Sequence, residues 1–404
     1  MRWLLLFTSA VGATVLFLVY LYLYSSSNAN EGNSSGVKVI KVQQAQQQAQ
    51  QQAQQKQGDC HVQRIGNEFS MVGKWQHTQE QDPAWQTTAK VDALACASKT
   101  SPFGNRPKMF QKGQGLHGCC FEHGCCDLPQ NQSDILLCPN YAQIATETET
   151  PQTTSPIQRF LHLNQRRTIL VLGDSIAAQI FAAIQMELRA HQIQHNATET
   201  TLFVTPFNVT VQLYYFYVLS NVNHTEWNVK MDGAATDNRI IPVMQKPDII
   251  IANMGLHNSH FPEFQYRSLK HLQNIALAER TRRRDNALPP QCFIWRRTSV
   301  QHYPAPHGCG VYQDNIDEVK HCWALTSSWN HVSDQSLDRV LNEAQNVTPP
   351  IAVMNMTSIF APAHALHSRR WDRPDCTHYC YSTRLYGPVM ELMTQTIQQA
   401  CQFL

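Results

Sequence analysis

The sequence predicts an α/β protein of three layers, in which helices cover both faces of a central, mainly parallel sheet. From about residue 151 onward, short runs of consecutive apolar residues alternate with stretches of helical periodicity. Strands buried on both faces read as continuous apolar runs, because neither side of such a strand meets water. Hydrophobic residues make up 43% of the 404-residue chain, enough for a sizeable core. We therefore place a large α/β domain at residues 151–404.

The individual elements of this domain follow from the same pattern. The apolar runs that we expect to form strands lie at residues 168–173, 201–204, 210–219, 248–255 and 292–295. A helix is expected at residues 177–191, where the sequence AAQIFAAIQMELRAH follows the first of these runs. Short apolar strands separated by helices imply a parallel sheet that is covered on both sides.

The N-terminus predicts a membrane anchor. Residues 3–24 carry no charged side chain and are long enough for a spanning helix, which needs about 20 apolar residues. Arg2 is the only basic residue before them, so the positive-inside rule puts residues 1–2 in the cytosol and the rest of the chain in the lumen. We expect an uncleaved single-span signal-anchor. A cleaved signal peptide, whose apolar region is usually only ~7–15 residues long, is the alternative.

Two segments separate the expected anchor from the α/β domain. Residues 25–58 form a glutamine-rich stem, either a disordered spacer or a fraying helical stalk. Residues 59–150 form a loop-rich subdomain whose folding is expected to begin near Cys60. Its cysteines should form disulfides in an oxidising lumen, with zinc ligation by the cysteine doublets as the alternative. The cysteines of this subdomain are Cys60, Cys96, Cys119, Cys120, Cys125, Cys126 and Cys138. The chain has 13 cysteines, so at least one is free or pairs between chains.

Composition gives no reason to expect a nucleic-acid partner, because 32 Lys and Arg residues face 30 Asp and Glu residues for a net charge of +2. Sequons agree with a lumenal glycoprotein; they are Asn33, Asn131, Asn196, Asn208, Asn223, Asn346 and Asn355.

Two groups of side chains have a structural and a carbohydrate-binding interpretation. The first group is an arginine cluster that is expected to be a solvated helix face, with binding of an acidic polysaccharide as the alternative. It comprises Arg280, Arg282, Arg283 and Arg284. Several tryptophans are expected in the core, with sugar contact as the alternative; they are Trp227, Trp295, Trp323, Trp329 and Trp371.

The candidate nucleophile is Ser175, in the sequence Gly173-Asp174-Ser175. A buried strand ends at Gly173 and a helix begins just after Ser175, so the hydroxyl would face the crevice at the carboxyl ends of the strands. Backbone N–H groups at the start of that helix would be available to a developing oxyanion. The alternative is a plain helix N-cap, which Asp and Ser both favour.

The candidate base is His378, three residues after Asp375. On one turn of helix the two would share a face, so that the carboxylate could orient the imidazole and leave its other nitrogen free for the serine proton. The alternatives are a surface Asp–His pair, or zinc ligation by Cys376, His378 and Cys380. Two other histidines, His302 and His257, are alternative bases.

Several stretches of the chain are similar to motifs of one family, and they occur in the family's order. Residues 172–179 resemble Val-Gly-Asp-Ser-Leu-x-Arg-Asn, and residues 207–214 resemble Tyr-Asn-x-Thr-Val-x-Phe-Tyr. Residues 247–255 resemble Asp-x-Leu-Val-x-Asn-Thr-Gly, and residues 375–380 resemble Asp-Cys-x-His-Trp-Cys. The chain thus resembles the GDSL/SGNH hydrolase superfamily, and more closely its PC-esterase branch, the trichome-birefringence-like polysaccharide O-acetyltransferases.

The resemblance implies an SGNH-like catalytic domain with Ser175 as nucleophile, His378 as base and Asp375 as its partner. It places Gly173, Asn253 and Gly255 near the oxyanion or substrate, with Asn258 as an alternative to Asn253. It also places Asn208 in a buried strand, where its sequon would go unused.

The chain departs from the family pattern at three places, which makes it a divergent member. The Arg-Asn after the serine is Ala178-Gln179, the Trp-Trp after the glycine is replaced by residues 256–258, and the Leu-Pro-Gly after the second cysteine is replaced by residues 381–383. The acceptor specificity of the family is therefore not carried over.

The resulting expectation is a lumenal O-acetyltransferase of the Golgi membrane that works through an acyl-enzyme on Ser175. The acceptor would be a polysaccharide or glycan hydroxyl, and an acetyl donor such as acetyl-CoA would be a substrate, with no cofactor or metal. A membrane protein that supplies the acetyl donor is a possible partner. The alternatives are a carbohydrate O-acetyl esterase with the same triad, or an inactive glycan-binding protein.

Overall fold

The computed structural model describes residues 60–73, 76–77, 136–137, 155–215, 240–254, 262–302, 322, 332–343, 351–363, 367–370, 373–379, 381 and 383–401. All of them lie in one compact unit, Gly58–Leu404. The expected anchor, the stem and most of the cysteine-rich segment lie outside the described residues, as do Gly255, His257 and Asn258. Among the helices that are described, none has the length and apolar character needed to cross a bilayer.

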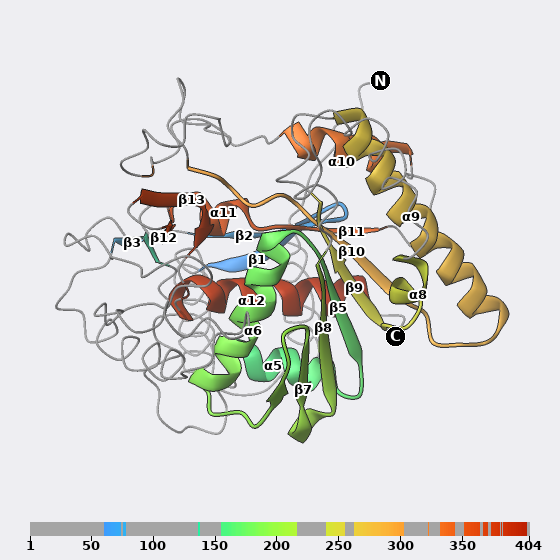
Figure 1. Cartoon of the computed structure of the whole chain (residues 1–404), viewed down its shortest axis with the longest axis horizontal. Coiled ribbons are helices and arrows are strands. Elements are labelled where there is room, and N and C mark those ends of the chain that lie inside the picture. Colours follow the sequence, from blue (N-terminus) through green and yellow to red (C-terminus); the bar gives the residue numbers. More distant parts are fainter. Residues whose placement is uncertain are drawn as a thin grey trace, which may run out of the picture. The chain divides into compact units, whose positions relative to one another are not determined.

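The centre of the fold is a nine-stranded sheet in the order β1-β2-β11-β10-β9-β5-β8-β7-β6 (Figure 1). Its strands are β1 (His61–Ile65), β2 (Glu68–Val72), β5 (Thr168–Gly173), β6 (Asn196–Ala197), β7 (Thr201–Val204), β8 (Val209–Tyr215), β9 (Ile249–Ala252), β10 (Cys292–Arg296) and β11 (Ala352–Asn355). The strands from β2 to β8 in this order pair in parallel, and β1, β7 and β6 add antiparallel edges. The predicted α/β class with a mainly parallel sheet is confirmed.

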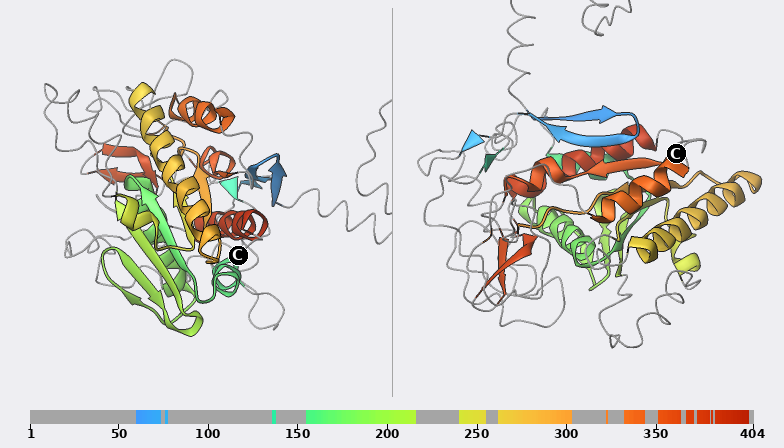
Figure 2. Two further views of the ribbon diagram at one scale, coloured as in Figure 1. Left: turned by 90° about the vertical axis from the view of Figure 1, so that its right-hand side faces the viewer. Right: turned by 90° about the horizontal axis from the view of Figure 1, so that it is seen from above.

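Helices pack on both faces of this sheet, which makes three layers (Figure 2). One face is covered by α5 (Pro156–Leu163), α6 (Ser175–Ala190) and α12 (Thr383–Ala400). The other is covered by α8 (Ile241–Met244), α9 (Pro262–Asp285) and α10 (Val332–Glu343).

Strand β5 shows why its sequence is apolar throughout. Ile169 and Val171 belong to the core beneath α6, whereas Leu170 and Leu172 belong to the core beneath α9. Successive side chains of a strand point to opposite faces, so a strand between two helical layers has no polar side.

The order in which strands are added to the sheet changes sides at β5. The chain places β8 on one side of β5 and then β9 on the other side, both parallel to it. In open α/β sheets such a switch point leaves a crevice at the carboxyl ends of the strands, where ligands bind. The segments that follow β5 and β9 therefore border the expected binding crevice.

Several predicted elements need correction. The run at residues 201–204 forms β7, but it pairs antiparallel with β8, and the helix expected from residue 177 already begins at Ser175. Strand β11 and the β1–β2 hairpin were not predicted. Because β2 pairs with β11, part of the segment assigned to a separate cysteine-rich subdomain belongs to the main sheet.

Two expected sequons lie on exposed backbone. Asn208 follows the short 3-10 helix η3 (Thr205–Phe207) in a left-handed conformation with φ 53°, and it is exposed before β8 begins. The expectation that it lies within a buried strand is wrong. Asn196 in β6 is exposed as well.

The arginine cluster of α9 is not a uniform solvated face. The side chain of Arg283 is only 8% exposed and pairs with the buried Glu279 at 2.8 Å. It also donates to the carbonyl oxygens of Gln245, Pro247 and Pro289. Arg283 thus ties the end of α9 to the turn that leads into β9. Trp295, another carbohydrate-binding candidate, is fully buried in β10.

We predict that Arg283→Met lowers the free energy of unfolding by on the order of 3–5 kcal/mol, because it breaks a buried ion pair and leaves backbone acceptors without a donor. Urea unfolding of the purified protein measures this. The control is Arg284→Met, since the Arg284 side chain is 75% exposed and a surface change should stay within about 0.5 kcal/mol. Equal effects of the two changes would contradict a structural role for Arg283.

Candidate active site

The candidate nucleophile lies at the junction of β5 and α6. Asp174 is the N-cap of α6, and its Oδ1 accepts a hydrogen bond from the Ile176 N–H at 3.1 Å. The same carboxylate lies 3.9 Å from the guanidinium of Arg296, and both side chains are buried. Ser175 is the first residue of the helix and is 6% exposed. The cap thus fixes the position of the serine as well as the start of the helix.

Gly173 is required by the close approach of β5 and the segment after β9. Its φ is +154°, and a Cβ on this residue would lie 2.3 Å from the carbonyl oxygen of Asn253 and 3.1 Å from the Ala177 Cβ. No side chain fits between two backbones that are this close. The glycine therefore allows the two strand ends to meet beside the serine.

The structure brings His378 to Ser175. The His378 Nε2 lies 2.7 Å from the Ser175 Oγ. When the imidazole is neutral with its proton on Nδ1, Nε2 accepts from the serine hydroxyl, which is the geometry of a nucleophile and its general base. Two residues 203 positions apart in the chain thus form the contact that their spacing alone could not establish.

His378 lies on β13 (Arg373–Tyr379), which among the described strands pairs with β12 (His367–Arg370) in a separate two-stranded sheet. The pairing passes from His367↔Tyr379 directly to Ser368↔Asp375, so the residues between Asp375 and Tyr379 form a bulge. Bulges redirect side chains and often occur next to active sites. Here the bulge contains the histidine that faces the serine.

The expected relation of Asp375 to His378 is corrected in one respect. The two residues lie on a strand and not on a turn of helix, so helical i,i+3 spacing does not bring them together. The bulge between them also interrupts the alternation of a regular strand. The side chain of Asp375 lies outside the part of the chain that is described.

The zinc alternative at this segment is wrong, because Cys376 forms a disulfide with Cys322. A disulfide sulfur is not a thiolate ligand. Cys380 lies outside the described residues. The backbone next to the disulfide is held as well, since the His302 N–H donates to the carbonyl oxygen of Cys376 at 2.9 Å.

His302 does not act as the alternative base, because both of its ring nitrogens are engaged away from Ser175. It is fully buried, with Nδ1 2.6 Å from the His367 Nε2 and Nε2 3.0 Å from the Ala361 carbonyl oxygen. The His367 Nδ1 in turn donates to the carbonyl oxygen of His378 at 3.0 Å. The two histidines therefore support the strand that carries His378.

Asn253 follows β9 and is 4% exposed. Its backbone N–H donates to the Leu172 carbonyl oxygen at 3.0 Å, and its Nδ2 donates to the Arg296 carbonyl oxygen at 2.7 Å. The structure thus places Asn253 beside Gly173, with one amide proton given to the backbone. Gly255, expected near the oxyanion with it, is not among the described residues.

The start of α6 also supplies backbone N–H groups next to Ser175. The Ile176 N–H is used by Asp174, and the Ala178 N–H donates to the Asp174 carbonyl oxygen. The N–H groups of Ser175 and Ala177 have no hydrogen-bond partner among the described residues. They can interact with a negative oxygen, which the positive end of the helix dipole also favours.

Buried charges surround the segment that follows β10. Burial raises the pKa of Asp334 to about 6, while the hydrogen bond from the Thr298 N–H and the positive charge of Arg297 act in the opposite direction. Burial also lowers the pKa of Arg296, against the charges of Asp174 and Asp334. The segment that follows β10 is thus held by charges with little access to water.

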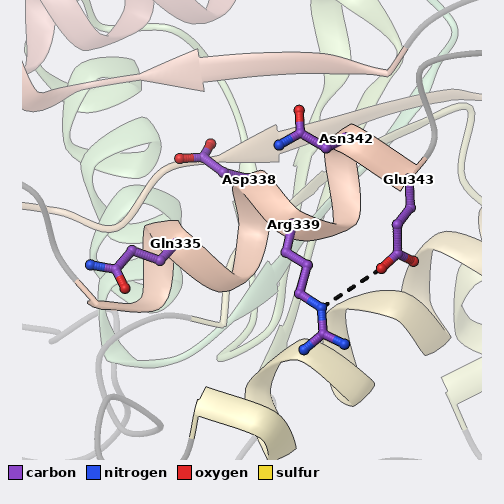
Figure 3. A pocket seen from close by; sticks show the side chains of 5 residues that line it. All are labelled: Gln335, Asp338, Arg339, Asn342 and Glu343. Carbon is purple, nitrogen blue, oxygen red and sulfur yellow. Dashed lines mark ion pairs between the residues drawn. The ribbon is translucent and has the colours of Figure 1, made fainter.

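An open surface pocket of ≈ 560 Å³ lies on α10 and contains none of these residues (Figure 3). Its lining side chains are polar, and two of them, Arg339 and Glu343, pair at 3.7 Å. Because all five lining residues lie on α10 and the pocket is open to solvent, a solvated helix face explains it better than a substrate site, which usually encloses most of its ligand.

Sequence reasoning missed the buried contacts that support the site. One of these contacts is made by Gln179, whose side chain bonds to the backbone of Tyr379. Gln179 follows Ser175 by one helical turn, and this i,i+4 spacing could have identified it as a residue on the same face of the helix. His302 was expected as an alternative base and not as a support, and no local signal distinguishes Arg296 or His367, because their partners come from distant parts of the chain. No protein-family model matches this chain, and no curated protein matches it.

We predict that Gly173→Ala destabilises the protein and slows the reaction of Ser175 with a fluorophosphonate by at least about 10-fold, because the added Cβ pushes the strand ends apart. Thermal unfolding and labelling rates measure the two effects. The control is Gly66→Ala, at a hairpin glycine with φ +60° where a Cβ would meet nothing within 4 Å. Gly66→Ala should therefore lose some stability through backbone strain but keep the labelling rate of Ser175. Labelling at the wild-type rate in both variants would contradict the role of Gly173 beside Ser175.

We predict that Asp334 makes the folded state less stable as the pH rises from about 4 to about 6. The unfolded carboxyl has a pKa near 4, so within this window the folded state keeps a proton that the unfolded state has lost. Asp334→Asn keeps an acceptor for Thr298 and removes the titration, so its stability should not fall in this window. Urea unfolding from pH 4 to 7 tests this against Asp338→Asn, whose side chain is 48% exposed. Parallel curves for wild type and Asp334→Asn would refute it.

Proposed function

We propose that this protein is a serine-dependent O-acyltransferase that transfers acetyl groups to polysaccharide or glycan hydroxyls. The observation that carries the proposal is the 2.7 Å contact between the His378 Nε2 and the Ser175 Oγ. It lies at the start of α6, beside the switch point of the sheet. A surface serine with a chance histidine neighbour would need neither the capped helix start nor the glycine that lets β5 and β9 meet.

In the proposed mechanism His378 takes the proton of the Ser175 hydroxyl while Oγ attacks the acetyl carbonyl carbon. The Oγ–C bond forms, the bond to the donor's leaving group breaks, and the proton on His378 is available to that group. A sugar hydroxyl then attacks the acyl-enzyme and gives its proton to His378. The acetyl group leaves on the sugar oxygen, and Ser175 regains its proton.

The oxyanion of each addition step would be stabilised by the N–H groups of Ser175 and Ala177. They point from the positive end of α6, where negative charge is favoured. Asp174 adds a negative charge nearby, which Arg296 offsets at 3.9 Å. In this proposal Gly173 leaves the space in which the ends of β5 and β9 meet beside Ser175. Asn253 and Gly255 keep their proposed place at the oxyanion or substrate.

The resemblance to PC-esterases and an SGNH-like fold form part of the same proposal. Three of the four similar stretches meet around the serine, since residues 172–179, 247–255 and 375–380 contribute Ser175, Asn253 and His378. Asp375 remains the proposed partner of His378. Both the order of the motifs and their meeting point support the family assignment.

A Golgi lumen with a single N-terminal anchor is the proposed location. Two disulfides, Cys292–Cys401 and Cys322–Cys376, support an oxidising compartment. The donor would be acetyl-CoA or a similar thioester, supplied with the help of a membrane protein. No cofactor takes part in the proposed chemistry.

The test incubates the purified protein with an acetyl donor and a panel of oligosaccharides, and detects acetylated sugar and free acetate by mass spectrometry. We expect acetylated sugar, and a loss of about 10³-fold or more in Ser175→Ala and His378→Ala. Ser358→Ala is the matched control, because the Ser358 hydroxyl is buried and has no partner among the described residues.

The other outcomes select among the alternatives. Serine-dependent acetate without acetylated sugar indicates an esterase, in which water takes the place of the acceptor. Neither product, together with no fluorophosphonate labelling of the folded protein, indicates a glycan-binding protein and overturns the proposal.

A further inference from the structure

Among the residues that the structure describes, no strand pairing joins the sheet of His378 to the sheet of Ser175. The serine belongs to the nine-stranded sheet and its helix α6, whereas the histidine belongs to the separate β12–β13 sheet. Within that sheet, His378 falls in the bulge between Asp375 and Tyr379, where no strand pairing holds it. Side-chain contacts and single backbone hydrogen bonds, such as that from the His302 N–H to the Cys376 carbonyl oxygen, must therefore hold the base opposite the nucleophile.

Gln179 makes such a contact directly between the two parts. Its Nε2 donates to the carbonyl oxygen of Tyr379 at 2.6 Å. Gln179 is four residues after Ser175 and therefore on the same face of α6, and Tyr379 is the residue after His378. The link joins the helix of the nucleophile to the strand of the base one residue away from the reacting histidine.

Both ends of this link are rigid. Gln179 is 2% exposed and Tyr379 is fully buried, so water does not compete for the bond. The Tyr379 hydroxyl donates to the Val300 carbonyl oxygen at 2.7 Å, and its ring packs on His367 at 4.2 Å between centroids. The carbonyl that Gln179 holds thus belongs to a residue that cannot move by itself.

Resting on the acyltransfer function proposed above, we infer that Gln179 is a positioning residue that sets the distance between the Ser175 Oγ and the His378 Nε2. The link closes a short ring that runs from Ser175 through one turn of α6 to Gln179, across to Tyr379, back to His378 and across to Ser175. Without the Nε2 donor, the Tyr379 carbonyl next to His378 is released from α6, while the bond from the Tyr381 hydroxyl to Glu187 still joins the chain two residues further on to the same helix. Proton transfer then becomes slower while binding of the acetyl donor is unchanged.

The first test compares Gln179→Met with Gln185→Met. Methionine keeps the length of the side chain but cannot donate a hydrogen bond. Gln185 lies on the same helix, is 3% exposed, and has an Oε1 without a partner among the described residues. We expect Gln179→Met to lower kcat for acetyl transfer about 10- to 100-fold with KM for the donor within about 2-fold, as a misplaced base predicts. Gln185→Met should keep kcat near wild type. Equal losses in the two variants, or a change confined to KM, would overturn the inference.

The second test uses Gln179→Glu, which donates to the Tyr379 carbonyl only when the new carboxyl is protonated. Ionisation places a negative oxygen against that carbonyl and breaks the link. Relative to wild type, the activity of Gln179→Glu should therefore be restored at low pH and lost as the pH rises. A purely structural role of Gln179 in filling space would not move the pH profile, so superimposable profiles would contradict the inference.

A crystal structure of Gln179→Met separates this inference from the proposed function. If the wild-type protein neither transfers acetyl groups nor reacts with a fluorophosphonate, the proposed function fails whatever Gln179 does. The distance between the His378 Nε2 and the Ser175 Oγ still tests the positioning. We expect it to lengthen beyond hydrogen-bond range, and an unchanged 2.7 Å contact would overturn the role of Gln179.

Discussion

The hydrogen bond between Ser175 and His378 joins two sheets that no strand pairing connects in the described part of the chain. The rest of the site depends on keeping these two side chains within 2.7 Å. Each side of the contact has its own support. Asp174 and the helix start fix the serine, while Cys322 and His367 hold the strand that carries the histidine. A single strand extended from the main sheet could not do this, because a regular strand gives a side chain only two directions.

Buried polar groups next to the cap of α6 support this arrangement. Arg296 interacts electrostatically with the carboxylates of Asp174 and Asp334, and its carbonyl oxygen accepts a hydrogen bond from the side chain of Asn253. An unpaired charge in this environment would be costly, so the groups stabilise one arrangement and destabilise others. The ion pair of Asp174 with Arg296 also offsets the negative charge that Asp174 brings close to Ser175.

The strands were predicted best where they are buried on both faces. The run at residues 168–173 has the bounds of β5, and CFIW predicted most of β10, because the two helical layers demand apolar residues throughout. Strand β11 was missed because its sequence AVMN has a single β-branched residue and so little preference for a strand. The hairpin β1–β2 was missed because one of its strands is exposed at the sheet edge. Pairing β2 with β11 needs residues that are far apart in the chain.

The sequence by itself determined the local features: the apolar strand, the glycine that ends it, and a serine at the start of the next helix. These depend on neighbours along the chain, such as the Asp174 cap and the space that Gly173 leaves. Only the tertiary structure decided which histidine contacts Ser175, since His302 is hydrogen-bonded to His367, whereas His378 is hydrogen-bonded to the serine. It also decided that a bulged strand carries His378, where the i,i+3 spacing suggested a helix. The reason is physical: a contact across 203 residues is set by the packing of layers and side-chain hydrogen bonds, which no local pattern encodes.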